Sequence, residues 1–268
     1  MAGPPESFAV PATVAVLAVR DRARALVRSA FPRRRCRLIL TRSAADLHNA
    51  LRTTLVDAAL LDVGAPNEDV WRALATVRDF PSIPFFALTP MRPTDGATIA
   101  RCASGECADI LVDGVDDGVM RPLVLSRGYS TRFVDALRTP PPPLRLTTDL
   151  QLAAWHVLIA YGGRPVRTDT LAAALGVSRE HLSRAFGAGG TANLKRLIDF
   201  VRLASAAELA KNPGFDVGDV ARVLAFASSS HLSTTAQRIV GIRPASLARL
   251  RTVDLVERFV HGRTRSRS

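Results

Sequence analysis

Two short helix pairs near the C-terminus constrain the fold of this chain more than any other feature. In the first pair, Leu171–Phe186, Leu171 and Leu182 take inward positions on two amphipathic helices. Gly176 suits the left-handed residue that ends the first helix, and Ser178 can cap the second by accepting a backbone N–H bond. A helix held by such a short turn, with its polar face exposed, has the shape that enters the major groove of DNA. A surface helical hairpin without a ligand shows the same pattern.

A second pair over Val217–Ile239 repeats this arrangement. Val220 and Leu224 mark the inner face of its first helix, and Ser228–Ser230 offers candidate caps for its second helix, which stops at Gly241. Two such pairs in sequence favour DNA binding more strongly than either pair alone.

A long amphipathic stretch, Ala192–Lys211, joins the two pairs and stops before Pro213-Gly214. A helix of that length spans about 30 Å at about 1.5 Å per residue. One turn of B-DNA measures about 34 Å. The spacing therefore predicts that the two reading helices enter successive major-groove segments on one side of a duplex.

At this point the chain resembles a known family. The stretch from about Leu144 to Leu250 is similar to the DNA-binding domain of AraC/XylS-type transcription regulators. The matching motifs, in chain order, are LAAALGVSREHLSRAF, RLASAAELA, DVARVLAF and VGIRPASL. The resemblance implies an all-α domain of seven helices, with two helix-turn-helix units joined by a long helix. We place this domain at residues 147–252.

Helical periodicity and the resemblance together indicate the DNA-facing side chains. These are Arg179, Glu180, Ser183 and Arg184 in the first unit, and Ser229, Ser230, Ser233, Thr234 and Arg238 in the second. The second unit departs from the family, which usually has glycine at the place of Ala225 and an aromatic-aromatic-Lys pattern at Leu232, Ala236 and Gln237. Its reading helix also lacks an early arginine. We therefore expect the second unit to add less specificity than the first, or mainly to hold phosphates.

The charge distribution agrees with a DNA partner. The chain has a net charge of +12, of which residues 144–268 carry +9. A basic excess on the proposed DNA-binding half favours phosphate binding through counterion release. Residues 253–268 are predicted to be the end of the last helix and a disordered basic tail.

The N-terminal half alternates strands and helices. The predicted strands are Thr13–Val19, Cys36–Leu40, Ala58–Leu61, Ile83–Leu88 and Ile110–Val112. The predicted helices are Asp21–Ala30, Ser43–Leu55, Asp69–Arg78, Asp95–Ala103 and Thr131–Leu137. This alternation predicts a doubly wound parallel five-stranded sheet of the receiver or flavodoxin type over residues 12–138. Residues 1–11 are expected to be disordered, and the Pro-rich segment 139–146 to be a stiff, extended linker.

The strand ends of this half resemble a response-regulator receiver domain. The motif DAALLDVGAP, ending at Pro66, is similar to the third receiver strand. The resemblance implies that Asp62 is the phosphoacceptor, that Thr89 is the switch hydroxyl, and that Asp21 is one of two acids that help hold Mg²⁺.

Two departures fall on the chemistry of that site. Arg20 stands where the second acid is expected, and Asp113-Gly114 stands where the family has Lys-Pro. Arg20 is therefore expected to pair with Asp62 or Asp113, which favours a degenerate receiver used for dimerisation or ligand sensing. Phosphorylation at Asp62, an α/β sensor that only looks receiver-like, and an ordinary turn residue at Asp62 remain alternatives.

Other features narrow the function classes. No apolar run approaches the roughly 18 residues that span a bilayer, and no signal peptide is expected. Cys36, Cys102 and Cys107 lack zinc spacing, so reduced thiols are expected, with a redox pair of Cys102 and Cys107 as an alternative. We expect no cofactor, no metal and no enzymatic activity. The rivals are a phosphotransfer enzyme acting through Asp21, Asp62 and Thr89, and a protein-interaction module.

The sequence thus predicts a cytoplasmic, sequence-specific transcription regulator. Its expected partners are double-stranded DNA and a second copy of itself, with RNA polymerase as a further candidate partner and no membrane.

Overall fold

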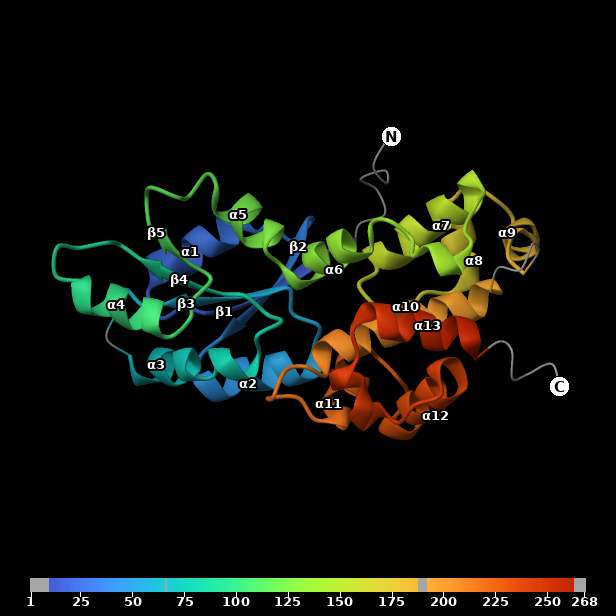
Figure 1. The fold of residues 1–268 in the computed structure, drawn as a ribbon. Coiled ribbons are helices and arrows are strands. Elements are labelled where there is room, and N and C mark those ends of the chain that lie inside the picture. The colour runs from blue at the N-terminus through green and yellow to red at the C-terminus, as the bar shows by residue number, and fades with distance from the viewer. Residues whose placement is uncertain (1–9, 66, 188–191, 263–268) are drawn as a thin grey trace. The chain divides into compact units, whose positions relative to one another are not determined.

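The computed structural model describes residues 10–65, 67–187 and 192–262. They fold into two compact units (Figure 1). The sheet unit comprises Pro11–Arg132 together with Asn212–Phe215, and the helical unit comprises the other described residues. Pro66, most of the predicted disordered N-terminus and the predicted basic tail from Arg263 onward lie outside the described residues.

The sheet unit is built on five parallel strands. These are β1 (Ala12–Leu17), β2 (Cys36–Thr41), β3 (Ala58–Asp62), β4 (Phe85–Thr89) and β5 (Asp109–Val112). Their order is β2-β1-β3-β4-β5, and every neighbouring pair is parallel. This is the strand order of flavodoxin-type doubly wound folds, and it confirms the predicted fold class of this half.

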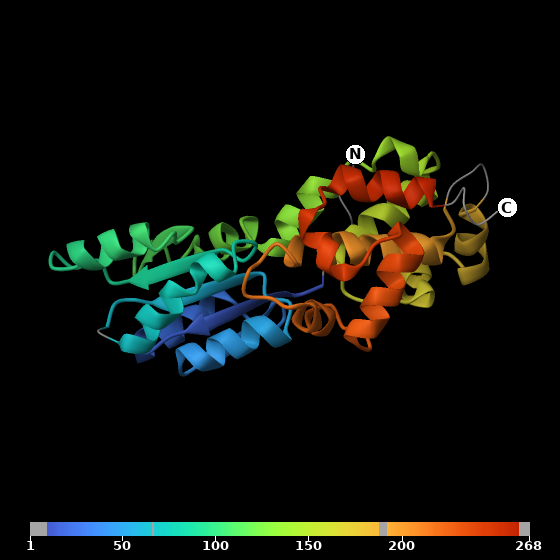
Figure 2. The same ribbon diagram turned by 60° about the horizontal axis from the view of Figure 1, so that its bottom comes forward.

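Helices cover both faces of this sheet. They are α1 (Asp21–Ala30), α2 (Ala44–Thr53), α3 (Glu68–Ala75), α4 (Gly96–Ser104) and α5 (Met120–Ser126). On one face α1 and α5 bury Val27 and Val124, and on the other α2 and α3 bury Leu51 and Val70 (Figures 1 and 2). Because both faces are covered, the central strands are apolar throughout, and polar groups gather at the strand ends.

Two helices of the sheet unit differ from the prediction. The helix expected over Asp69–Arg78 stops at Ala75 and continues as a 3₁₀ turn over Val77–Asp79. Both the amide and the hydroxyl of Thr76 donate to the carbonyl of Ala73, which tightens the last turn. Helix α5 was not predicted, because it has only seven residues, includes Pro122 and begins without a side-chain cap.

The helical unit is all-α, as predicted. Its seven α-helices among the described residues are α7 (Asp149–Ala160), α8 (Thr168–Ala174), α9 (Arg179–Ala185), α10 (Leu194–Leu209), α11 (Val217–Val223), α12 (Ser229–Val240) and α13 (Thr252–His261). Helix α6 (Tyr129–Leu137) leads into them. Trp155, Phe200 and Phe259 are fully buried, and the rings of Phe200 and Phe259 lie 4.5 Å apart. Helix α13 is therefore part of this core, beyond the predicted domain end at residue 252.

The helix between the two pairs is shorter than predicted. It has 16 residues rather than 20, so it spans about 24 Å rather than about 30 Å. The side chain of Asn193 accepts a hydrogen bond from the Arg196 amide at 2.9 Å, and this cap starts the helix at Leu194. At the other end the helix closes at Ala210.

The Pro-rich segment is also not fully extended. Pro142–Leu144 forms a 3₁₀ turn, because burial of the Leu144 side chain draws the chain inward. Over the described part of the chain, none of the helices has the length and apolar character required to cross a membrane.

Candidate functional site

The first helix pair has the predicted turn. Gly176 takes a positive φ of 66° between α8 and α9, which a glycine adopts without steric cost. The Ser178 hydroxyl accepts a hydrogen bond from the His181 amide at 3.1 Å and caps α9. Leu171 and Leu182 are fully buried beneath the turn. The packing therefore fixes α9 by its inner face and leaves its outer face to solvent.

The four DNA-facing side chains predicted for this unit are all exposed on α9. Arg179 lies 3.5 Å from Asp169 of α8, and the Nε of Arg184 donates to the Glu180 carbonyl at 3.4 Å. Contacts of that length on an exposed surface are weak. Both guanidinium groups are thus available to an incoming ligand.

In the second pair, the left-handed residue of the turn is Ala225 rather than a glycine. Ala225 has a positive φ of 51°, a conformation that costs about 1–2 kcal/mol for a residue with a Cβ atom. Asp216 caps α11 by accepting from the Asp219 amide, and Ser228 caps α12 by accepting from the His231 amide. The departure from glycine noted in the sequence is therefore a strained position in the fold.

Arg202 of α10 supports that strained turn. Its Nη2 donates to the carbonyls of Leu224 at 3.1 Å and Ala225 at 3.3 Å, and its guanidinium lies 3.9 Å above the ring of Phe226. These contacts satisfy carbonyls that the end of α11 leaves without helical partners.

The polar side chains on the outer face of α12 have stronger intramolecular contacts than those on α9. The hydroxyls of Ser233 and Thr234 donate to the helix carbonyls of Ser229 and Ser230 at 2.9 and 3.0 Å. Arg238 donates to Asp199 of α10 at 2.8 Å, and Asp199 is only 14% exposed. The Arg238 guanidinium thus ties α12 to α10, whereas Ser229 and Ser230 are exposed at the start of the helix.

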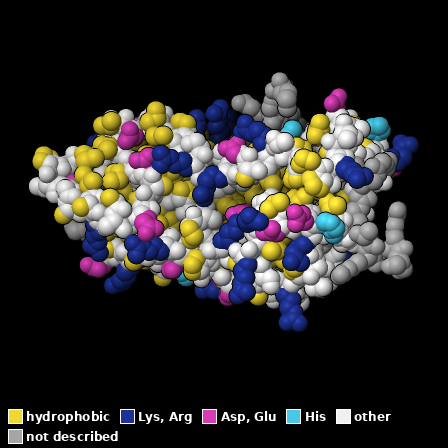
Figure 3. All heavy atoms as spheres, in the orientation of Figure 1, with side chains coloured by type: hydrophobic (Ala, Val, Ile, Leu, Met, Phe, Trp, Pro, Cys, Tyr) yellow, Lys and Arg dark blue, Asp and Glu magenta, His cyan; other side chains and the backbone are white. Residues whose placement is uncertain are grey.

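Helix α10 packs directly against α11 and α12 of the second pair, and against α7, which contacts α8 and α9 of the first pair. Its Arg196 donates to the carbonyls of Ile239 and Phe259 at 3.4 and 2.7 Å, which ties α10 to the ends of α12 and α13. Figure 3 shows Lys and Arg side chains standing out from the surface over α11 and α12. The helical unit therefore presents two capped, polar helices, and basic side chains stand out from its surface.

A second group of polar side chains lies at the carboxyl end of the sheet. The Nε and Nη2 atoms of Arg20 lie 2.7 and 2.6 Å from Asp62 Oδ1, and its Nη1 lies 2.6 Å from Asp113 Oδ2. The two carboxylates are almost completely buried, at 0% and 1% exposure. One guanidinium therefore bridges two buried carboxylates.

The backbone completes the shell of Asp62. Its Oδ2 accepts from the amides of Val19 at 3.1 Å and Arg20 at 2.8 Å, and its Oδ1 accepts from the Gly64 amide at 3.3 Å. Burial opposes the charged guanidinium, but hydrogen bonds and charge from both carboxylates raise the pKa of Arg20 above its ordinary value. The predicted pairing of Arg20 is thus present with both acids.

The structure does not bring Asp21 into this group. Asp21 is 99% exposed at the start of α1 and lies 3.5 Å from Arg24. Thr89 ends the strand next to Asp62, and its hydroxyl donates to Asp95 at 3.2 Å. Asp62 and Thr89 thus share the sheet edge, while Asp21 faces solvent.

The residues at this edge do not fit Mg²⁺. Mg²⁺ requires an octahedron of oxygen atoms, and here a guanidinium occupies the space between Asp62 and Asp113. No group of three or more His, Cys, Asp or Glu side chains in the described residues is arranged to hold a metal ion.

The three cysteines are free in this structure. Cys36 and Cys102 are buried, and Cys107 is half-buried. A hydrogen bond from Cys107 lowers the pKa of the Cys102 thiol, against the effect of burial.

Comparison with known proteins identifies the helical unit. Residues 171–249 match the family described as a helix-turn-helix domain. These residues form a helix-turn-helix domain of the AraC type. The match supports a role of this domain in DNA-binding transcription regulation. No curated protein matches the sequence.

Among solved structures, a response regulator from Thermotoga maritima aligns with 44% of this chain and 99% of its own, at 16% identity and a TM-score of 0.37. Full-length FixJ from B. japonicum aligns over 84% of this chain and 96% of its own, at 11% identity and a TM-score of 0.39. The strand order β2-β1-β3-β4-β5 of the sheet unit is itself that of a receiver-like fold.

Sequence reasoning missed two supporting residues of the helix-turn-helix domain. Arg202 interrupts the apolar run of α10, and Asp199 stands one turn before it. A charged residue within a buried helical stretch usually has a specific partner, and that signal could have identified both.

Proposed function

We propose that this regulator reads DNA through α9 and α12, each placed in one of two neighbouring major-groove segments. The observation that carries the proposal is that both helices are capped by a serine and expose polar faces, while α10 packs against α12 and against α7, which in turn contacts α9. A helix presented in this way fits the major groove. Because α10 is only about 24 Å long, contact with two segments about 34 Å apart favours a duplex bent toward the protein.

We propose that the first unit supplies most of the sequence specificity. Arg179 and Arg184 are exposed and weakly held on α9, and an arginine fork recognises guanine O6 and N7. On α12 the only arginine, Arg238, is committed to Asp199. The contributions of Glu180, Ser183, Ser229, Ser230, Ser233 and Thr234 belong to the same proposal.

We further propose that residues 12–138 act as a degenerate receiver that dimerises the regulator, joined through residues 139–146 to the DNA-binding residues 147–252. The bridge from Arg20 to two carboxylates supports a single fixed conformation of the sheet edge. A dimer would place two DNA-binding domains on paired half-sites. The alternative is a response regulator phosphorylated at Asp62.

Selection of bound duplexes from a random pool by the full chain tests the proposal. The expected product is a motif whose most constrained positions lie under α9, followed by hydroxyl-radical protection of two groove segments. Protection confined to one groove segment would exclude the arrangement in which α9 and α12 contact two segments. A selected motif without paired half-sites, together with a monomer in sedimentation, would exclude the dimer. Contact with RNA polymerase is a separate proposal, testable by transcription with purified polymerase on the selected site.

A further inference from the structure

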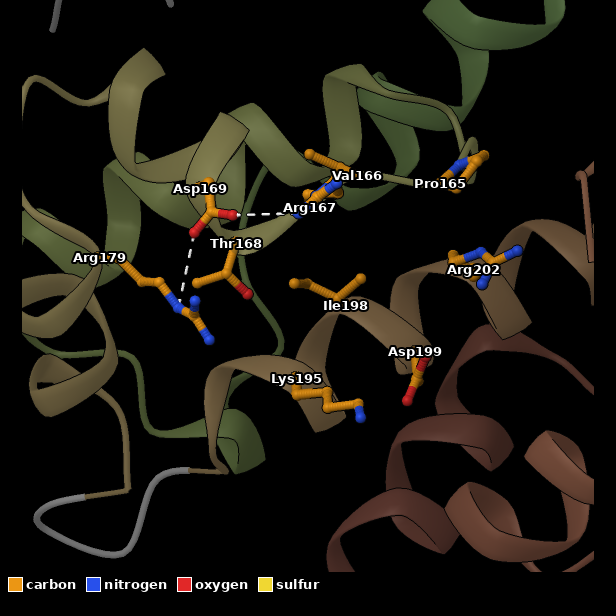
Figure 4. A pocket seen from close by; sticks show the side chains of 10 residues that line it. All are labelled: Pro165, Val166, Arg167, Thr168, Asp169, Arg179, Lys195, Ile198, Asp199 and Arg202. Atoms are coloured by element: carbon orange, nitrogen blue, oxygen red, sulfur yellow. Dashed lines mark hydrogen bonds and ion pairs between the residues drawn. The ribbon is translucent and has the colours of Figure 1, made fainter.

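The helical unit contains a basic pocket beside α9 and α10. Its volume is about 360 Å³. Four cationic side chains, Arg167, Arg179, Lys195 and Arg202, line it together with two carboxylates, Asp169 and Asp199. Figure 4 shows these side chains arranged around Ile198.

The carboxylates do not neutralise this pocket. Asp169 forms ion pairs with both Arg167 and Arg179, at 3.5 Å each, and Asp199 is already paired with Arg238. Exposed ion pairs of that length contribute little, so Arg167 and Arg179 can exchange Asp169 for another anion at small cost. Lys195 is exposed and forms no ion pair with any described residue.

Arg202 adds a partly buried cation to the wall of the pocket. Its Nε atom is buried and has no hydrogen-bond partner among the described residues. Burial lowers the pKa of Arg202 from its ordinary value, because the charged form loses solvation. Apolar lining from Ile198 and Val166 strengthens the attraction of these cations for an anion.

The pocket is lined by the start of α9 and by α10, and α10 holds α12 through an ion pair. Arg179, the first residue of α9, lines one edge. Asp199 lines another edge and holds Arg238 of α12. A duplex that contacts both helices must carry its backbone past the space between them.

We propose that this pocket holds one phosphate group of the DNA backbone, between the segments contacted by α9 and α12. The inference rests on the proposed function and adds a defined backbone contact to it. Guanidinium forks match the geometry of phosphate oxygens, and a lysine adds a mobile point charge. Such a contact fixes the register of both reading helices without reading sequence.

The salt dependence of binding tests the contact. Each phosphate contact steepens the dependence of log K on log salt by about 0.9. For Lys195→Ala in the full chain, we expect the affinity ratio of parent to variant on the selected duplex to fall by about 3.5-fold between 50 and 200 mM salt. Lys211→Ala is the matched control, since Lys211 lies just beyond the other end of α10 and pairs with Glu208. Its slope should equal that of the parent.

A scan with neutral methylphosphonate linkages identifies the phosphate. At one position between the two groove segments, a neutral linkage should weaken DNA binding by the parent. The same linkage should weaken DNA binding by Arg167→Ala to a different extent and leave DNA binding by Lys195→Ala unchanged. A Lys195→Ala slope equal to that of the parent, or the absence of any coupled position, would overturn the inference while leaving the selected motif intact. A parent protein that selects no duplex would overturn both the inference and the proposed function.

Inorganic phosphate separates the two sources of the ligand. Without DNA, millimolar phosphate should raise the thermal midpoint of the parent no more than potassium chloride of equal ionic strength. A phosphate-specific rise that Lys195→Ala abolishes, without a coupled backbone position, would overturn the DNA assignment and make the pocket a site for a soluble phosphate ester.

Discussion

Arg20 and Asp62 form a two-pronged ion pair in which the Nε and Nη2 atoms of the guanidinium lie 2.7 and 2.6 Å from Asp62 Oδ1. The third guanidinium nitrogen, Nη1, lies 2.6 Å from Asp113 Oδ2. A group that would carry a phosphoryl adduct is thus held by a cation of the same chain. Gly64 allows this approach, since a Cβ atom there would lie 2.6 Å from Arg20 Cζ.

Arg20→Ala should destabilise the sheet unit by about 3 kcal/mol, because it leaves two buried carboxylates without their counter-ion. Two facing carboxylates without a cation are a better site for a divalent metal ion than the parent. Millimolar MgCl₂ should therefore raise the thermal midpoint of Arg20→Ala more than that of the parent protein.

Arg78→Ala is the matched control, since Arg78 and Glu106 form an exposed ion pair at 3.0 Å. Its loss should cost about 0–1 kcal/mol, with no response to magnesium. An Arg20→Ala variant as stable as this control would show that the buried bridge does not hold the sheet edge together.

Ala225→Gly should stabilise the helical unit. It removes the strain of a positive φ of 51° at an exposed Cβ, offset in part by the greater freedom of glycine in the unfolded chain. A net gain of about 1 kcal/mol would raise the thermal midpoint by about 2–4 °C.

The reverse change in the first turn provides the control. Gly176 has a φ of 66° and open space around its Cβ position, so Gly176→Ala tests backbone strain alone and should lower the midpoint. If both substitutions lowered it, strain at Ala225 would be excluded as a source of instability.

The fold was largely predictable because its signals are local. Buried strands, glycine and serine at the helix-turn-helix turns, and alternation of strand and helix fixed the fold class and most element bounds. The predicted helix bounds were wrong where tertiary contacts or short-range hydrogen bonds determine the end of a helix. At Thr76, two hydrogen bonds to the Ala73 carbonyl end the helix, and at Asn193 a side-chain cap shortens α10.

The candidate sites were predictable to a smaller extent. The sequence indicated exposed positions on α9 and the pairing of Arg20, because both follow from residue type and spacing. It could not indicate that Arg238 pairs with Asp199, or that Asp21 points to solvent. Those outcomes depend on how distant segments pack and on side-chain direction.

Arg184→Ala should relax sequence preference. A bidentate contact to guanine contributes about 1–3 kcal/mol of discrimination, so the gap between the selected duplex and one altered at the contacted base should narrow by about 5- to 150-fold. Lys195→Ala should instead weaken binding to all duplexes alike, because phosphate contacts carry no sequence information. Competition binding against a panel of single-base variants measures both. A loss of affinity by Arg184→Ala that is equal for all duplexes would show that Arg184 contacts the DNA phosphate backbone and not a base.

Acetyl phosphate should leave Asp62 unmodified. Transfer to an aspartate needs Mg²⁺ to offset the charge that builds up on the phosphoryl group, and here the Arg20 guanidinium fills the space between Asp62 and Asp113. Asp113 adds a second buried negative charge, which makes a dianionic adduct less favourable. Intact-protein mass spectrometry after incubation with acetyl phosphate and MgCl₂ should show no phosphoryl adduct on either the parent or Asp62→Asn. An adduct on the parent that is absent from Asp62→Asn would establish a working response regulator and reject the degenerate receiver.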